Sequence, residues 1–223
     1  MDLVISLPHH LPHPGRPARR WSVVGLLLGC LLLAARPGRA QSADQSAAFA
    51  ASYVAEGKGE YPDAIAALKN AYINSYEQNL RLGWLYFLAK NYAASATYYQ
   101  KAVEQRPAAL EPRLGLVKPL NALNQLDKLL KLYADILSID PQNTQANYWT
   151  GVIYLNRRAY DKAARHFERV VNLYPFDYDA TLSLAWTYLN LGRKPDARAL
   201  YQRVLLIRPG DTDAQAGLKR LAN

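Results

Sequence analysis

Four prolines recur at a fixed interval along this chain. Pro107, Pro141, Pro175 and Pro209 are each separated by 34 residues, and an aromatic residue stands eight positions before each of them. A regular interval of about 20 to 50 residues indicates a repeat architecture, in which each unit must stack on its neighbours to bury its apolar face. The interval therefore restricts the chain to a linear array of similar units.

The residues between the prolines predict a pair of helices in each unit. In the unit that ends at Pro175, we expect one helix over Tyr148–Arg157 and a second over Asp161–Leu173. Pro175 ends the second helix, because proline lacks an amide hydrogen and disfavours helical geometry in the residue before it. Small residues such as Gly151 and Ala163 stand where the two helices must approach closely.

At these positions the chain resembles the tetratricopeptide repeat family, whose pattern is roughly W-x2-L-G-x2-Y, then an alanine, an aromatic residue, another alanine and a proline. The matching residues are Leu82, Gly83, Tyr86, Tyr92, Ser95, Tyr99, Ala102 and Pro107 in one unit, Gly151, Tyr154, Tyr160, Ala163, Phe167 and Pro175 in another, and Leu184, Ala185, Tyr188, Gly192, Ala197, Tyr201 and Pro209 in a third. The resemblance implies an all-α fold, a right-handed superhelical solenoid of antiparallel helix pairs.

The expected domains are a signal peptide over residues 1–40, five hairpins over about 45–75, 76–109, 110–143, 144–177 and 178–211, and a capping helix over 211–223. The third hairpin is irregular, because Leu129 replaces a small residue and Pro119 falls inside the expected first helix, where we predict a kink. In the capping helix, Ala214, Leu218 and Leu221 should cover the last hairpin.

The N-terminal residues predict an export signal. Arg19 and Arg20 precede a mostly apolar segment, Trp21–Ala35, which is too short for a comfortable membrane span. Gly38-Arg39-Ala40 then supplies small residues at the two positions that a signal peptidase reads, so the mature chain should begin near Gln41. An uncleaved membrane anchor is the alternative.

The single cysteine, Cys30, raises a second alternative. Leu27-Leu28-Gly29-Cys30 resembles a lipoprotein box, whose cysteine is lipidated after cleavage, but three leucines follow where a lipoprotein normally turns polar. Cleavage after Ala40 would instead remove the only cysteine, leaving the mature chain without disulfide or thiol chemistry.

Charge and motifs argue against nucleic-acid binding and catalysis. The net charge is +9, but residues 1–40 hold five arginines and one acid, which leaves 22 basic and 17 acidic residues for the rest. That mild excess is not the footprint of a dedicated nucleic-acid binder. The remainder has one histidine, His166, and lacks the common zinc, nucleophile-elbow and phosphate-loop motifs. We therefore expect no catalytic residue, no metal and no cofactor.

The family resemblance implies that the first helices of the hairpins line a concave groove. Exposed aromatic side chains supply contact area and asparagines supply paired donors and acceptors, so both types suit a bound peptide. The candidate groove residues are Tyr53, Arg81, Trp84, Phe87, Lys118, Asn121, Tyr148, Val152, Asn156, Trp186 and Asn190. Packing in the core is the alternative for each of these residues. Trp149, which is not among them, shows the problem most clearly, because it could pack beneath the next hairpin.

A basic patch stands in the fourth unit, formed by Arg157, Arg158, Lys162, Arg165 and Arg169. The last three share one helical face. The patch is either a solvated outer face or a docking surface for an acidic partner, anionic envelope lipid or glycan.

The resemblance and the export signal together predict an adaptor of a bacterial-type envelope, periplasmic or associated with the outer membrane, that binds a peptide or protein segment. Membrane contact would be peripheral or through a lipid anchor at Cys30. The alternatives are a glycan-binding or cell-wall-binding solenoid that uses Trp84 and Trp186, and an accessory subunit of an envelope enzyme.

Overall fold

The computed structural model describes residues 37–222, and every regular element in that range is an α-helix. The elements are α1 (Pro37–Gly57), α2 (Tyr61–Asn70), α3 (Tyr76–Leu88), α4 (Tyr92–Gln105), α5 (Glu111–Ala122), α6 (Leu126–Ile139), α7 (Thr144–Asn156), α8 (Tyr160–Leu173), α9 (Tyr178–Asn190), α10 (Lys194–Ile207) and α11 (Thr212–Ala222). The predicted export segment up to Arg36, with Cys30, lies outside the described residues. The expected cleavage position after Ala40 falls near the start of α1.

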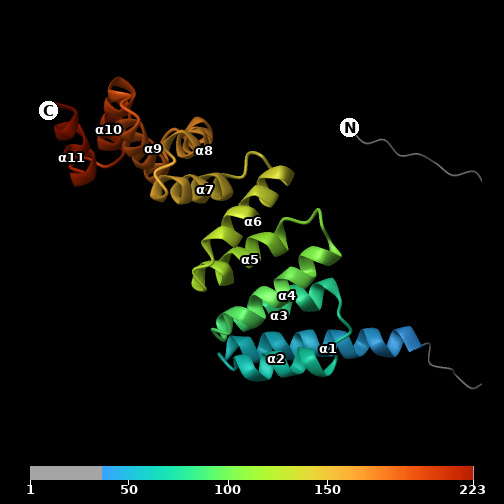
Figure 1. Ribbon diagram of the computed structural model, residues 1–223. Helices are drawn as coiled ribbons and strands as arrows, with labels where there is room; N and C mark the ends of the chain where they lie inside the picture. Colours follow the sequence, from blue (N-terminus) through green and yellow to red (C-terminus); the bar gives the residue numbers. More distant parts are fainter. Residues whose placement is uncertain (1–36, 223) are drawn as a thin grey trace, which may run out of the picture. The chain divides into compact units, whose positions relative to one another are not determined.

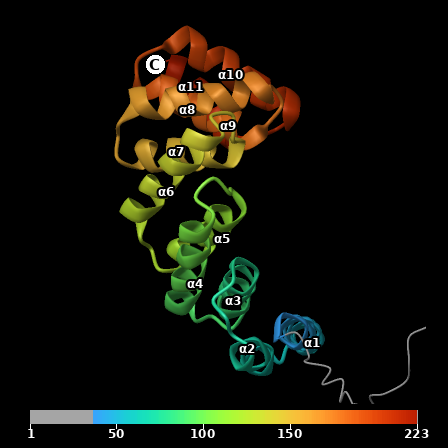
Figure 2. The same cartoon turned by 90° about the vertical axis from the view of Figure 1, so that its right-hand side faces the viewer.

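Consecutive helices pair as hairpins, which follow one another in chain order (Figures 1 and 2). The second helix of each hairpin packs on the first helix of the next, as α4 does on α5 and α8 on α9. First helices also contact one another, as in α3 with α5 and α7 with α9. The predicted all-α solenoid of helix pairs is confirmed, with one face built from first helices and the other from second helices.

The repeating prolines set where the second helices end. α4, α6, α8 and α10 each stop two residues before the proline, and the intervening residue has φ of −133°, −130°, −130° and −134° respectively, outside helical geometry. The proline ring clashes with a helical conformation of the residue before it, which explains this shared ending. Asn143 and Asp177 then begin α7 and α9, because each side chain accepts a hydrogen bond from the amide three residues later.

From the second hairpin onward, the turn inside each hairpin also repeats every 34 residues. Lys90, Asn124, Arg158 and Gly192 all adopt a positive φ, between 54° and 73°. Glycine takes this left-handed conformation without strain, whereas Lys90 and Arg158 adopt it at a cost that hairpin packing must offset. Arg158 of the predicted basic patch is therefore a turn residue.

Small residues allow the two helices of a hairpin to approach closely. In the second hairpin, Ser95 donates a hydrogen bond from its hydroxyl to the carbonyl of Gly83 at 2.7 Å. In the fourth hairpin Gly151 faces the fully buried ring of Phe167, where an added Cβ would lie 2.7 Å from the ring. Small residues in the repeat pattern, such as Gly151, therefore stand where the two helices of a hairpin come close together.

The third hairpin lacks these small residues. Val117 and Leu129 occupy the places that Gly151 and Ala163 occupy one repeat later. Accordingly α5 contacts its partner α6 less extensively than the helices of the other hairpins contact each other, and it packs more on α4. The helix α5 runs through Pro119 to Ala122, and the kink expected there stays a prediction. The irregularity therefore lies in the spacing of the two helices.

The last helix, α11, closes the array at its C-terminal end. Ala214 and Leu221 are buried and Leu218 is half-buried, facing the last hairpin. Asp211 begins the helix: its carboxylate accepts hydrogen bonds from the Tyr178 hydroxyl at 2.7 Å and from the Ala214 amide at 2.9 Å. The hydrogen bond from Tyr178, and after it the one from the backbone, hold the pKa of Asp211 below its ordinary value of 3.8.

This cap predicts a loss of stability in acid. Because the folded state lowers the pKa of Asp211, its contribution is complete above the unfolded pKa and is lost as the pH falls through the folded pKa. Asp211→Asn keeps a good capping side chain but removes the charge. The difference in Tm between wild type and Asp211→Asn should therefore shrink as the pH falls from about 6 to about 3. A difference that stays constant over that range would contradict the role of the charged cap.

Candidate functional site

A cavity of about 710 Å³ opens on the face formed by the first helices of the first three hairpins. We call it the groove. Its principal lining residues are Phe49 and Tyr53 from α1, Tyr76, Glu77, Leu80, Arg81 and Trp84 from α3, and Glu111, Leu114, Gly115 and Lys118 from α5, with Tyr99, Arg106 and Gln145 at its borders. Three helices from separate hairpins therefore supply one surface.

Helical spacing explains why these side chains share a face. Tyr76, Leu80 and Trp84 follow one another at intervals of four residues along α3, and Leu114 and Lys118 do so along α5. Residues four apart lie on the same side of a helix. Because first helices lie side by side in the solenoid, the two stripes form adjoining walls of the groove.

A polar network under the groove ties α1 to α3. Glu56 forms an ion pair with Arg81, whose side chain is only 8% exposed, and accepts a hydrogen bond from the indole nitrogen of Trp84 at 2.7 Å. The Nε of Arg81 donates to the hydroxyl of Ser52 at 3.2 Å, and its guanidinium lies 3.8 Å from the ring centroid of exposed Tyr53. Within the described residues, Nη2 of Arg81 is buried and has no acceptor.

The indole of Trp84 is half-buried, with neighbours over its ring. The ring of Phe87 stacks on it with centroids 6.0 Å apart and an interplanar angle of 27°. The ammonium nitrogen of Lys118 lies 4.7 Å from the indole centroid, which is within cation–π range. Lys118 is exposed and takes part in none of the ion pairs found between residues 43 and 222.

At the opposite end of the groove one ion pair forms, and Glu111 contacts a tyrosine hydroxyl. Arg106 forms an ion pair with Glu77 at 2.9 Å and stacks over the ring of Tyr76 at 4.0 Å. The hydroxyl of Tyr76 points to the carboxylate of Glu111 at 3.4 Å. The groove thus offers an apolar floor with one free cation, Lys118, near Trp84.

The structure gathers four of the predicted groove residues in this cavity: Tyr53, Arg81, Trp84 and Lys118. Phe87 lies beside them through its contact with Trp84. Others lie elsewhere: Tyr148, Val152 and Trp186 are half-buried and pack against the C-terminal core, while Asn121, Asn156 and Asn190 are exposed outside the cavity. Trp149, for which core packing was the alternative, is 44% exposed.

Sequence reasoning missed the leucines of the groove floor. Leu80 and Leu114 stand four residues before Trp84 and Lys118, so helical spacing from the predicted residues would have found them. A leucine on an amphipathic helix normally indicates core, and only the arrangement of three hairpins exposes these two to a shared cavity.

The predicted basic patch spans the α7–α8 turn and the exposed side of α8. Arg157 forms an ion pair with Asp127 at 2.7 Å, and the ammonium of Lys162 lies 5.4 Å from the ring centroid of Tyr154. Arg165 and Arg169 are exposed on α8. Docking to an anionic partner through these residues stays a prediction.

His166, the one histidine considered for catalysis, has a packing role. Its ring is half-buried and stacks on Tyr154 with centroids 5.8 Å apart, and its Nδ1 lies 3.0 Å from the amide oxygen of Asn147. Burial, and then the charge of Arg169, lower the pKa of His166. The ring therefore helps to hold α7 against α8.

Between residues 37 and 222, no group of three or more His, Cys, Asp or Glu side chains is placed to hold a metal ion.

Over the same range, no helix combines the length and apolarity needed to span a membrane.

Family models described as tetratricopeptide repeat match residues 49–109 and 115–177, and a further one matches residues 154–221. The chain belongs to the tetratricopeptide repeat family. The resemblance drawn from the spaced prolines and glycines is thereby confirmed. Proteins of this TPR fold are generally non-enzymatic scaffolds for interactions between proteins.

Solved structures support the same fold. The TPR chain is similar to MamA, with a TM-score of 0.66 and 19% identity over 74% of this chain and 92% of that one. It is similar to a TPR protein from Parabacteroides merdae, with a TM-score of 0.68 and 18% identity over 80% and 72% of the two chains. YrrB, described as a TPR protein with an unusual peptide-binding site, gives a TM-score of 0.61 and 19% identity over 75% and 88%. Comparison with curated protein sequences found no match.

The network around Glu56 predicts a specific loss of stability. Glu56→Ala leaves the buried guanidinium of Arg81 without its counter-charge, so the free energy of unfolding should fall by about 1–3 kcal/mol. Asp127→Ala breaks an exposed ion pair and should cost less than about 1 kcal/mol. Urea titration measures both values. Equal losses in the two variants would show that the network does not hold α1 against α3.

Proposed function

We propose that this TPR protein is a scaffold that holds an extended peptide segment of another protein in the groove. The observation that carries the proposal is the cavity of about 710 Å³ over α1, α3 and α5, which combines an apolar floor with an unpaired lysine. Cavities of roughly 300–1,000 Å³ with a few convergent polar groups are typical of binding sites. Family membership supports a protein ligand.

The groove chemistry indicates what such a peptide carries. An apolar side chain fits over Leu80 and Leu114, and a carboxylate beside it pairs with the ammonium of Lys118. The unsatisfied Nη2 of Arg81 gives a donor for a peptide carbonyl, provided that the ring of Tyr53 moves aside. Glu111 at the other end, which takes part in no ion pair of residues 43–222, disfavours a second acidic residue there.

The surroundings of the tryptophans favour a peptide over a glycan. Sugar rings stack on open aromatic faces, but the Trp84 indole already stacks with Phe87, and the Lys118 ammonium lies close to both rings. Trp186 meets the ring of Tyr201 at 5.6 Å and has the guanidinium of Arg220 at 5.0 Å from its own centroid. Both indoles therefore already have partners close to their rings, which supports a peptide rather than a sugar as the ligand.

The peptide proposal is tested with 12-residue peptides selected on the purified full-length chain by display. Lys118→Glu should weaken binding of the selected peptides at least tenfold in fluorescence anisotropy, because it places a like charge against the peptide carboxylate. Lys219→Glu, which changes an exposed lysine on α11 that lines neither this cavity nor any other described here, is the matched control and should leave binding unchanged. Peptides that bind both variants alike would overturn the assignment, and saturable binding of soluble envelope glycans in their place would favour the glycan alternative.

We further propose that the scaffold acts in a bacterial-type envelope, in the periplasm or at the outer membrane. The support is the sequence from Arg19 to Ala40, which has the order of charge, apolar segment and small residues of an export signal. Expression in a Gram-negative host followed by fractionation and mass spectrometry should give a periplasmic chain that begins near Gln41. A full-length chain confined to the cytosol would contradict this location, and a lipidated N-terminus at Cys30 would identify an anchored form.

A further inference from the structure

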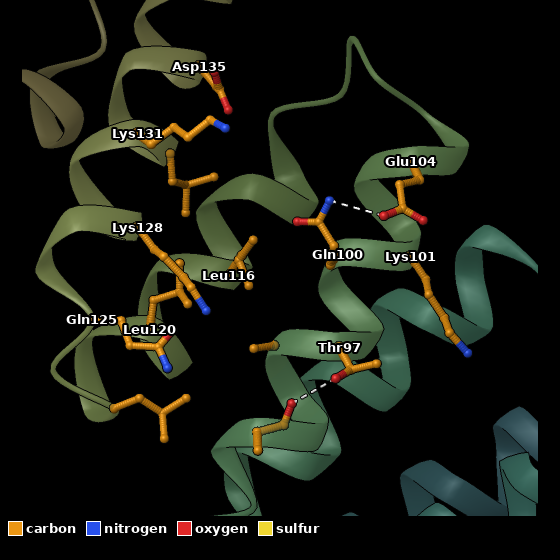
Figure 3. Close-up of a pocket in the computed structure, with 14 residues that line it drawn as sticks. Thr97, Gln100, Lys101, Glu104, Leu116, Leu120, Gln125, Lys128, Lys131 and Asp135 are labelled. Atoms are coloured by element: carbon orange, nitrogen blue, oxygen red, sulfur yellow. Dashed lines mark hydrogen bonds between the residues drawn. The ribbon is translucent and has the colours of Figure 1, made fainter.

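A second cavity, of about 850 Å³, lies between α4 and α6 with α5 beneath it (Figure 3). We call it the outer cleft. It shares no lining residue with the groove, and its walls belong to second helices. The corresponding cavity between α6 and α8 is only about 330 Å³. The outer cleft is therefore a local feature of the third hairpin.

The bulky residues of that hairpin account for the cleft. Val117 and Leu129 stand where a neighbouring hairpin has Gly151 and Ala163, so α5 and α6 cannot close on each other in the same way. Because α5 packs chiefly on α4, the outer cleft stays open between α4 and α6.

The floor and walls of the cleft suit an amphipathic helix. Leu116 and Leu120 from α5 and Leu132 from α6 form an apolar floor. The flanking helices α4 and α6 have 14 residues each. At about 1.5 Å per residue, these helices make the outer cleft roughly 20 Å long. A helix that binds in a groove inserts apolar side chains spaced three, four and seven residues apart, which such a floor can accept.

Basic and acidic side chains lie at different positions along the outer cleft. Lys128 lies on the α6 wall near its N-terminal end and Lys131 near its middle, whereas Glu104 and Asp135 lie toward the C-terminal ends of α4 and α6 (Figure 3). Lys101 of α4 also lines the cleft, but it points away from α6 in Figure 3 and its ammonium lies 3.5 Å from the Tyr72 hydroxyl. Lys128 and Lys131 are exposed, and no ion pair of residues 43–222 includes either lysine. Glu104 accepts a hydrogen bond from Gln100 at 3.2 Å.

We propose that the outer cleft is a second docking site, which binds an amphipathic helix of a partner protein with acidic residues in its first turns and basic residues in its last turn. Such a helix runs parallel to α4 and α6: its carboxylates meet Lys128 and Lys131, and its basic end meets Glu104 and Asp135. Acidic first turns and basic last turns are also the arrangement that the helix dipole favours, so the partner needs no unusual sequence. The protein would then hold two partners on opposite helix layers.

The test uses two synthetic 14-residue peptides, each stapled as a helix, with the same leucine stripe. One has glutamates in the first two turns and lysines in the last turn, and the other has these charged ends exchanged. The full-length chain should bind the first peptide at least tenfold more tightly in fluorescence anisotropy. Its glutamates meet Lys128 and Lys131 and its lysines meet Glu104 and Asp135, whereas the exchanged peptide places like charges together at these residues.

Charge reversal on the wall supplies the decisive comparison. Lys128→Glu combined with Lys131→Glu should abolish or reverse the preference between the two peptides, whereas Lys118→Glu in the groove should leave it unchanged. Both substituted wall residues are exposed, so circular dichroism should show an unaltered fold. Equal affinity for the two peptides, a preference that survives the double substitution, or no binding of either peptide at 1 mM would overturn the proposal (1 mM corresponds to about −4 kcal/mol). Because the groove has its own peptides and its own lysine variant, either proposal can fail alone.

Discussion

The fold depends on one packing constraint, the insertion of an aromatic ring from α4, α8 and α10 against glycines of the helices packed on them. The ring of Tyr99 faces Gly83 in its own hairpin and Gly115 in the next, and an added Cβ at Gly83 would lie 2.8 Å from it. Tyr201 meets Gly217 of α11 in the same way. A single hairpin leaves such a ring half covered, so burial is complete only when the next first helix stacks on it. The side-by-side arrangement of first helices, and with it the groove, follows from this.

Departures from that constraint create the surfaces with the most distinctive chemistry. Where Val117 and Leu129 replace the small pair, the third hairpin opens and the outer cleft appears between α4 and α6. On the other layer, Arg81 and Trp84 are fixed by Glu56 from α1, so the groove has a rigid base before any ligand arrives. Preorganisation of this kind lowers the entropic cost of binding. The groove thus depends on the regular stacking of first helices, and the outer cleft depends on the irregular third hairpin of the same array.

Helical spacing predicted several residues of the candidate site, but it did not predict which neighbours each of them contacts. Trp84 and Lys118 stand at equivalent first-helix positions 34 residues apart, and the structure brings them to one cavity with Arg81. Trp186 shares the position of Trp84 but packs against Tyr201, because the last hairpin and α11 close over that part of the array. Equivalent positions in a repeat therefore contact different neighbours, which the local pattern does not encode.

The sequence by itself determined the helices, their ends and their order of stacking. Proline geometry acts on the residue directly before it, and capping by Asn143 or Asp177 acts within one turn, so both can be recognised in the linear pattern. Only the tertiary structure decided which leucines face a cavity, that Glu56 lies beneath Trp84, and that the third hairpin is open. These features depend on distances between helices from different repeats, which are set by the summed volumes of many side chains rather than by any local signal.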